Sequence, residues 1–171
     1  MKKLLIILSS MLLFVHAKAQ SEEEFLPQVT LLAMDSTEGA AKRFCDQVVT
    51  AVPEYRLALA DREDVMMSKY VYDNGDFELL KFEFQFIVRE VEDEEGVPAK
   101  MRIVRVQRIS CDLATMTKIY NYIYNTAHTP DKIMALSRYD KPVSYNGKAY
   151  NSNLYSDEFK PGYWVLSFFK L

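Results

Sequence analysis

Apolar and polar positions alternate most regularly between Phe77 and Glu92. The apolar side chains hold the even positions and are Leu80, Phe82, Phe84, Phe86 and Val88. The polar side chains hold odd positions and include Lys81, Glu83, Gln85 and Arg89. A period of two predicts a strand with one buried face and one face toward water. We expect this strand to be the centre of the fold.

Two further strands are predicted on either side of this one. Val65–Tyr72 precedes it across a turn at Asp73–Asp76, and Lys100–Cys111 follows it after a break at Asp93–Gly96. Asp, Asn and Gly accept the backbone conformations of tight turns, so the three strands form an antiparallel meander. In the third strand the apolar phase changes after Ile103, which predicts a β-bulge or burial on both sides. A short strand is also expected around Leu57, although the composition there suits a helix too.

Three helices are predicted from apolar positions that recur at helical spacing. The first covers Asp35–Val52, where Asp35 and Glu38 have the spacing of a capping box and Pro53 follows. The second runs from Asp112 to about Thr126. A third starts at Pro130, a proline suited to the first helical position, and continues to Tyr139.

The C-terminal part returns to strands. A hairpin is predicted over Val143–Tyr150 about Asn146 and Gly147, and a last strand over Tyr163–Phe169. The order of elements predicts an α+β fold, an antiparallel β-sheet with two to three helices packed on one face. We expect a single domain over residues 35–171, preceded by a tail and lead-in at 20–34.

The first 19 residues have the pattern of an export signal. Lys2 and Lys3 precede the apolar run Leu4–Val15, and Ala17 and Ala19 supply the small residues of a cleavage site. We predict cleavage after Ala19 and a location in the periplasm, at the cell surface or outside the cell. An uncleaved anchor or a buried helix is the alternative. No later segment has the length of about 20 apolar residues that a membrane helix needs.

The charge of the remaining chain argues against two classes of partner. The export segment holds three of the 21 basic residues and none of the 24 acidic ones, so 18 basic residues face 24 acidic ones and the net charge is −6. This sign disfavours nucleic acid and anionic membrane as partners.

Two cysteines, Cys45 and Cys111, remain after the predicted cleavage. Export would permit a disulfide between them. Two separate buried thiols, which behave as small apolar side chains, fit the positions equally well.

No motif for catalysis, a cofactor or a metal stands out. His128 is the one histidine outside the export segment, and it follows a predicted helix, where a structural role at the helix end is expected. One histidine and two separated cysteines give no spacing for a transition metal. Paired carboxylates have no short linear signature, so an enzyme that uses carboxylates and tyrosine in a cleft is an alternative.

Tyrosine and asparagine are concentrated in the C-terminal half. This composition is typical of binding surfaces, because tyrosine offers contact area at low entropic cost and asparagine adapts its hydrogen bonds. The candidate contact residues are Tyr122, Tyr145, Asn146, Tyr150, Asn151 and Tyr155. Alternatively, Tyr120 and Tyr124 belong to the core and the others decorate a hairpin. We expect an exported, non-enzymatic domain that binds a protein, peptide or glycan; a structural assembly subunit is a further alternative.

Overall fold

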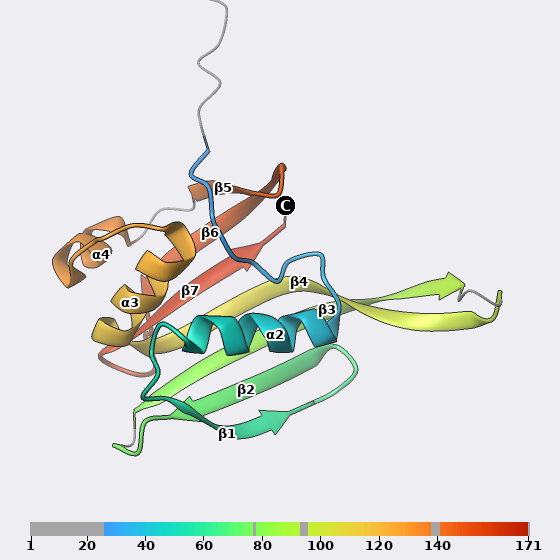
Figure 1. Cartoon of the computed structure of the whole chain (residues 1–171), viewed down its shortest axis with the longest axis horizontal. Coiled ribbons are helices and arrows are strands. Elements are labelled where there is room, and N and C mark those ends of the chain that lie inside the picture. Colours follow the sequence, from blue (N-terminus) through green and yellow to red (C-terminus); the bar gives the residue numbers. More distant parts are fainter. Residues whose placement is uncertain (1–25, 77, 93–95, 138–140, 171) are drawn as a thin grey trace, which may run out of the picture.

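The structure of the chain is a computed structural model that describes residues 26–76, 78–92, 96–137 and 141–170 (Figure 1). Within these residues it contains three helices and one sheet of seven antiparallel strands. In chain order the elements are α2 (Glu38–Val49), β1 (Arg56–Asp61), β2 (Met67–Asp73), β3 (Leu79–Glu92), β4 (Pro98–Asp112), α3 (Leu113–Tyr124), α4 (Pro130–Leu136), β5 (Lys141–Tyr145), β6 (Lys148–Ser156) and β7 (Tyr163–Phe169). The strand order across the sheet is β1-β2-β3-β4-β7-β6-β5. The predicted α+β class and the predicted three-strand meander, which is β2-β3-β4, are confirmed.

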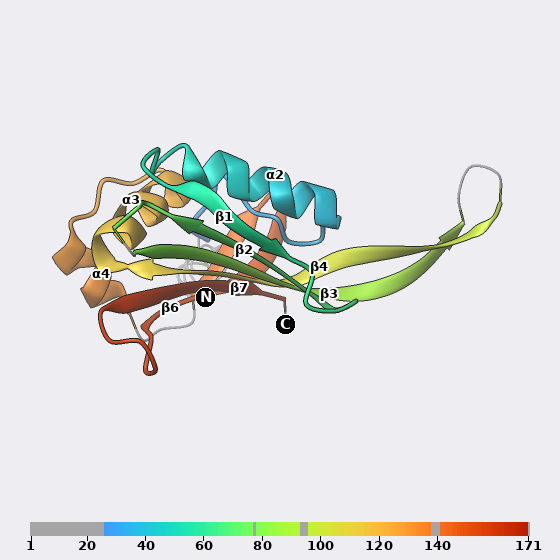
Figure 2. The same cartoon turned by 90° about the horizontal axis from the view of Figure 1, so that it is seen from below.

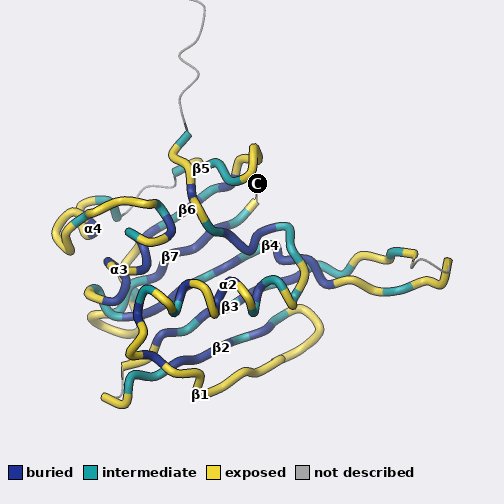
Figure 3. The backbone as a smooth tube through the Cα atoms, in the orientation of Figure 1, coloured by how far each residue is buried: buried dark blue, intermediate teal, exposed yellow. Residues whose placement is uncertain are grey.

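The alternation of β3 places its aromatic residues in the core. Leu80, Phe82 and Phe84 are fully buried and Phe86 nearly so, whereas the odd positions of the strand are half-buried or exposed. Val88, the fifth apolar position of the predicted face, is only half-buried. Phe44 of α2 meets the rings of Phe82 and Phe84 edge-on, with centroid distances of 6.1 and 6.3 Å. Figure 3 shows the buried stretches running through the middle strands and avoiding β1 at the edge. A one-residue slip of β3 would expose these rings, so burial fixes its register.

Helix α2 begins two residues later than the capping pattern predicts. Its N-cap is Thr37, which makes no side-chain cap hydrogen bond. Asp35 has a φ of 58° and its carboxylate contacts residues of other elements, described below. Glu38 accepts a hydrogen bond from Ser68 at 2.8 Å and forms an ion pair with Arg102. Both acidic side chains are therefore used in tertiary contacts and form no capping box.

The other two helices begin where their caps predict. Asp112 accepts a hydrogen bond from the Thr115 N–H at 3.0 Å, and α3 ends at Asn125 in the left-handed conformation with a φ of 51°. Thr129 precedes Pro130 at the start of α4. This helix ends at Leu136, because Ser137 has an extended backbone; residues 138 and 139 of the predicted helix lie outside the described residues.

β4 contains a bulge, but it lies at Arg105 and not directly after Ile103, where the sequence predicted it; Ile103 and Val104 are instead both buried, the alternative prediction. Gln85 and Phe86 are adjacent in β3 but pair with Val106 and Val104, so Arg105 is the extra residue. Arg105 Nη1 lies 3.5 Å from Asp35 Oδ1, which connects the bulge to the residues before α2.

The segment before α2 belongs to the folded body. The Val29 N–H donates to the Ser144 carbonyl of β5 at 3.0 Å, and the Ser144 N–H donates to the Pro27 carbonyl at 2.9 Å. Leu32 and Met34 are buried in the main core. This stretch, expected to be a lead-in, thus covers the outer edge of β5.

Strands β3 and β4 extend beyond the rest of the sheet as a two-stranded arm (Figures 1 and 2). Their residues 87–92 and 98–103 pair with one another, whereas β2 reaches β3 only up to Gln85 and β7 reaches β4 only up to Val106. An isolated pair of strands is marginally stable in water, so the base of the arm must be well anchored.

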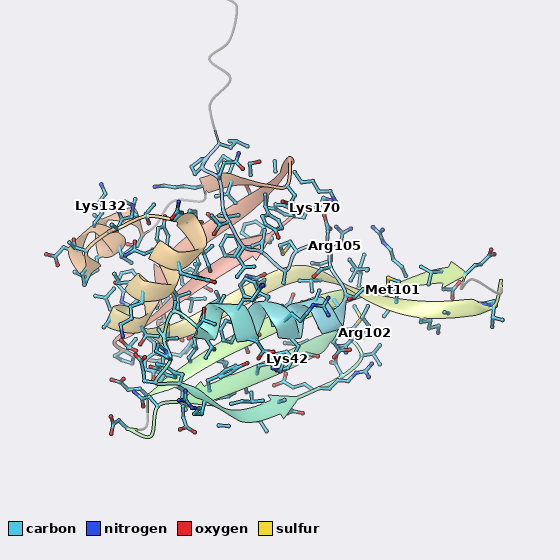
Figure 4. The ribbon with its side chains drawn as sticks, viewed as in Figure 1. Lys42, Met101, Arg102, Arg105, Lys132 and Lys170 are labelled. Atoms are coloured by element: carbon cyan, nitrogen blue, oxygen red, sulfur yellow. The ribbon has the colours of Figure 1, made fainter. Side chains whose placement is uncertain are left out.

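Arg102 anchors the base of this arm (Figure 4). Its side chain is 8% exposed, and its guanidinium carbon lies 4.1 Å from the centroid of the Phe86 ring. Its Nη2 donates to the carbonyl of Met67 at 3.2 Å, and its Nη1 forms the ion pair with Glu38. One buried cation therefore joins β4, β2 and α2.

Candidate functional site

Two rows of side chains cross the sheet on the face opposite Phe84. The backbone register places the members of each row side by side, at the strand spacing of about 4.8 Å. The first row, across β3, β4, β7 and β6, is Lys81, Ser110, Val165 and Tyr155. The second row, on the same four strands, is Glu83, Arg108, Ser167 and Asn153.

The hairpin between β6 and β7 borders the first row. The Asp157 carboxylate accepts hydrogen bonds from the N–H groups of Phe159 at 2.9 Å and Lys160 at 3.2 Å. The Asp157 N–H donates to the Tyr163 carbonyl at 2.8 Å, and Lys160 Nζ lies 3.3 Å from the Tyr163 ring centroid. These contacts fix the turn, yet the side chain of Phe159 is 96% exposed. An ordered turn thus holds an aromatic ring in solvent.

Two hollows flank this hairpin and share Tyr155 and Glu158; together we call them the Tyr155 site. The sheet-face hollow has a volume of about 310 Å³ and is lined by Lys81, Glu83, Arg108, Ser110, Tyr155, Asp157, Glu158, Phe159 and Val165. The end hollow lies toward α4 and is lined by Met134, Ala135, Ser137, Tyr155, Ser156, Glu158 and Trp164. Ligand pockets span roughly 300–1,000 Å³, so the sheet-face hollow fits one or two side chains.

Arg108 is the cation of the sheet-face hollow that lacks a partner. It is half-buried, and its guanidinium forms no hydrogen bond or ion pair with any residue that the structure describes. Its cross-strand neighbour Glu83 is paired instead with Lys81 at 3.2 Å. A guanidinium has five N–H donors and binds a carboxylate through two of them, so Arg108 can accept an acidic group from another molecule.

Asn153 adds an unsatisfied acceptor to the same row as Arg108. Its Oδ1 is buried and has no hydrogen-bond partner among the described residues. Buried polar atoms are nearly always paired, and an exception points to a missing partner. The row therefore contains an unpaired donor group that lines the hollow, Arg108, and an unpaired acceptor that is shielded from solvent, Asn153 Oδ1.

Of the residues predicted for binding, Tyr155 and Asn151 lie on the face of this site. Both are at odd positions of β6, whereas Tyr150 is at an even position, on the core side of the strand, and is 4% exposed. The Tyr150 hydroxyl donates to Asp35 Oδ2 at 3.1 Å. Burial, followed by that carboxylate, raises the pKa of Tyr150 to about 12. Tyr150 is thus committed to an internal contact.

The remaining predicted residues lie elsewhere. Tyr145 is half-buried against the core at the end of β5. Asn146 has a φ of 49° and forms the turn to β6 with Gly147. Tyr122 is 42% exposed on α3 and lines a separate hollow with Thr30, Leu31, Gln47, Asn121 and Asn125. The structure therefore divides the predicted cluster between the two faces of the sheet and α3.

An aromatic hollow that the sequence did not indicate lies beside α3. Tyr120 and Tyr124 are stacked at 4.2 Å, and His128 lies 6.0 Å from Tyr120. Tyr120 was expected in the core and is buried there, but both rings also line a hollow with Leu136 and Lys141. The i, i+4 spacing of the two tyrosines was the available signal, because it stacks their rings on one helix face. His128 is held by its backbone, which is hydrogen-bonded to the Asn121 side chain.

The cysteines and the acidic residues form no metal centre in the described part of the chain. Cys45 and Cys111 are free and buried, and burial raises the pKa of both thiols. A raised pKa keeps them protonated and unreactive. Among the described residues, no group of three or more His, Cys, Asp or Glu is placed to hold a metal ion.

Comparisons with known proteins give no relative for this chain. No protein-family model, no curated protein and no solved structure matches it. None of the helices in the described ranges has the length and apolar character needed to cross a membrane.

Proposed function

We propose that this protein is an exported, non-enzymatic binding domain that takes an acidic peptide segment of a partner protein into the Tyr155 site. The observation that carries the proposal is Arg108, a half-buried cation without a partner among the described residues, in a hollow that Tyr155 also lines. Leaving a cation partly desolvated and unpaired costs free energy, and an incoming carboxylate would recover it.

The arrangement of the helices supports the use of this face. Phe44 of α2 contacts Phe84, and Tyr124 of α3 lies 6.3 Å from Phe168. Phe84 and Phe168 both pair with Gln107, so they point to one side of the sheet. We infer that the helices pack on this side and leave the rows of Arg108 and Tyr155 accessible from the other.

The chemistry of the hollow favours a peptide. A carboxylate can bind Arg108, and an adjacent side chain can pack on Tyr155 and Phe159. A peptide carries both kinds of group within a few residues. The volume of about 310 Å³ matches one or two side chains and not a whole helix.

Export is the second part of the proposal. It is supported by the basic start at Lys2 and Lys3, the apolar run Leu4–Val15 and the small residues at Ala17 and Ala19. All of these lie outside the described residues. N-terminal sequencing of protein recovered from the cell envelope or medium should give Gln20 as the first residue; an intact Met1 would contradict cleavage.

A displayed library of random peptides tests the binding site, with a glycan array probed in parallel. We expect enrichment of peptides in which Asp or Glu lies beside an aromatic or aliphatic residue. Arg108→Gln should weaken the enriched peptides by about tenfold, because one charge-assisted pair is lost. Tyr155→Ala should weaken them by a similar factor.

Tyr122→Ala is the matched control, because Tyr122 is a similarly exposed tyrosine in a different hollow. It should leave peptide binding unchanged. Loss of binding in Tyr122→Ala and retention in Tyr155→Ala would move the site to α3 and contradict the proposal. Binding of glycans without peptides, or a hydrolase activity lost in Glu158→Gln, would contradict the peptide and the non-enzymatic assignments respectively.

A further inference from the structure

One edge strand of the sheet, β5, is covered by another segment of the chain, and the other edge strand, β1, is not covered by any described segment. At the β5 edge, the segment around Gln28 lies alongside Ser144 and forms two backbone hydrogen bonds with it. At the other edge, β1 has no strand beyond it in the described part of the chain, and all six of its residues are exposed. An uncovered edge presents a row of backbone N–H and C=O groups to any strand that can pair with it.

The middle of β1 lacks the usual protection of an edge. Its four central residues, from Leu57 to Ala60, are all apolar, and Leu57 and Leu59 are 46% and 48% exposed. Lysine or proline in the middle of an edge strand normally prevents pairing, and β1 has neither. Its charges lie at the ends, Arg56 first and Asp61 last. We propose that β1 pairs antiparallel with β1 of a second copy of this chain, forming a two-fold symmetric dimer with one continuous sheet.

The charged residues of β1 are complementary to those of a second β1 strand that runs antiparallel to it. In an antiparallel pair related by a two-fold axis, a contact from residue i to residue j occurs twice. The sequence Arg-Leu-Ala-Leu-Ala-Asp then places Arg56 opposite Asp61 of the second copy at both ends. It also places each leucine opposite an alanine, which fills space without a clash.

The irregularity in β1 brings these residues onto matching faces. The two-fold axis is perpendicular to the sheet, so paired residues must lie on the same face, and residues five apart in a regular strand do not. Between Leu57 and Leu59 the register shifts by one residue. As a result Arg56 pairs with Asp73 and Asp61 pairs with Lys69, and these β2 residues share a face.

The same shift aligns the apolar pair. Leu57 pairs with Tyr72 and Ala60 pairs with Tyr70, two residues apart on β2 and therefore on one face. Leu57 can then lie opposite Ala60 of the second copy. The bulge, which in many edge strands hinders pairing, here makes the self-complementary register consistent across the strand.

This interface is small and polar at its ends. Stable interfaces bury roughly 1,200–2,000 Å² in total, and six residues on each side bury less, so the dimer forms at high protein concentration. Exposed Arg–Asp pairs are screened by salt, so the dimer weakens as salt is added. The β1 edge and β6 lie far apart in the strand order, so the dimer does not depend on the Tyr155 site.

Sedimentation velocity on the purified protein over a range of concentrations tests the proposal. We expect a monomer–dimer equilibrium. Arg56→Asp and Asp61→Arg should each raise the dissociation constant about tenfold or more, because like charges then meet at both ends. A mixture of these two variants should form a heterodimer again, because its charges are complementary at both ends. The double variant Arg56→Asp/Asp61→Arg should also dimerise.

Two further variants control for folding and for net charge. Leu59→Lys puts a charge in the middle of the edge and should abolish the dimer in a folded monomer, as circular dichroism will report. Lys132→Asp changes the net charge by the same amount as Arg56→Asp, but on the exposed surface of α4 (Figure 4), and it should leave dimerisation unchanged. A wild type that stays monomeric at all concentrations, a dimer insensitive to Leu59→Lys, or no heterodimer in the mixture would overturn the proposal.

Discussion

Lys170 Nζ lies 3.1 Å from Asp35 Oδ2, so the last described residue of the chain is joined to the segment that leads into α2. Figure 4 shows Lys170 and Arg105 on the same side of the molecule, near the segment that leads into α2. Tyr150 and Arg105 contact the same carboxylate, which is 15% exposed. One acidic side chain therefore connects β4, β6 and the C-terminal end of β7 to the N-terminal segment.

Asp35→Asn should lower the free energy of unfolding by about 1–3 kcal/mol at pH 7, because hydrogen bonds and ion pairs to a charged group are lost. Burial acts to raise the pKa of Asp35, but hydrogen bonds from Lys170 and Tyr150 and the nearby lysine charges lower it below its usual 3.8. A lowered folded-state pKa gives stability that is present above pH 3.8 and lost as the pH falls through the folded-state value. Urea unfolding at pH 7 and pH 3 should show the difference between wild type and Asp35→Asn shrinking at the lower pH. An equal difference at both values would mean that the charge of Asp35 contributes nothing.

Arg102→Ala should destabilise the protein by about 2 kcal/mol. This loss is below the 3–5 kcal/mol typical of breaking a fully buried pair, because the partner Glu38 is one-third exposed and can be hydrated. Hydrogen bonds from Ser68 and Arg102 outweigh burial and lower the pKa of Glu38, so part of the loss should disappear in acid. Thermal melts of Arg102→Ala and Arg105→Ala provide the comparison. A larger loss in Arg105→Ala, whose side chain is 32% exposed, would place the main anchor at the bulge.

Phe84→Asp should prevent folding, whereas Gln85→Asp should cost less than about 1 kcal/mol. Phe84 is fully buried between the rings of Phe44 and Tyr70, and a carboxylate there would be desolvated without a partner. Gln85 is half-buried on the opposite face of the same strand, where water can reach it. Circular dichroism and urea midpoints measure both variants. Similar midpoints would mean that the buried face of β3 is assigned incorrectly.

Cys45 and Cys111 should react with a thiol reagent only after unfolding. Both are fully buried and free, and burial raises the pKa of each thiol, so the native protein offers no accessible thiolate at pH 8. Denatured, non-reduced protein should give two reactive thiols. A count of zero under these conditions would show that the protein carries the disulfide.

Much of this fold follows from the order of residues. The alternation of β3 has a period of two, which only a strand with one buried face satisfies, and it identified Leu80, Phe82, Phe84 and Phe86 as core residues. The last strand, β7, has the predicted bounds because proline and glycine form a turn immediately before it. Turn residues, caps and hydrophobic periodicity are local properties, and the sequence contains all of them.

The start of α2 shows where local signals fail. Asp35 and Glu38 have the spacing of a capping box, but each finds stronger partners on distant strands. Charged partners brought within hydrogen-bond distance by tertiary packing outweigh a cap, which is worth about 1 kcal/mol. No local sequence pattern indicates that these two side chains bind distant partners instead of capping the helix.

The Tyr155 site was decided by the order of the strands. The composition of the C-terminal half made Tyr155 a candidate contact residue. Nothing in the sequence distinguished Arg108 from the other arginines of the predicted strands. Arg108 and Tyr155 come together because β7, the last strand in the chain, lies between β4 and β6. The sequence by itself determined which face of β3 is buried, since that depends on period. Only the tertiary structure decided which exposed residues become neighbours, because strand pairing joins segments that are far apart in the chain.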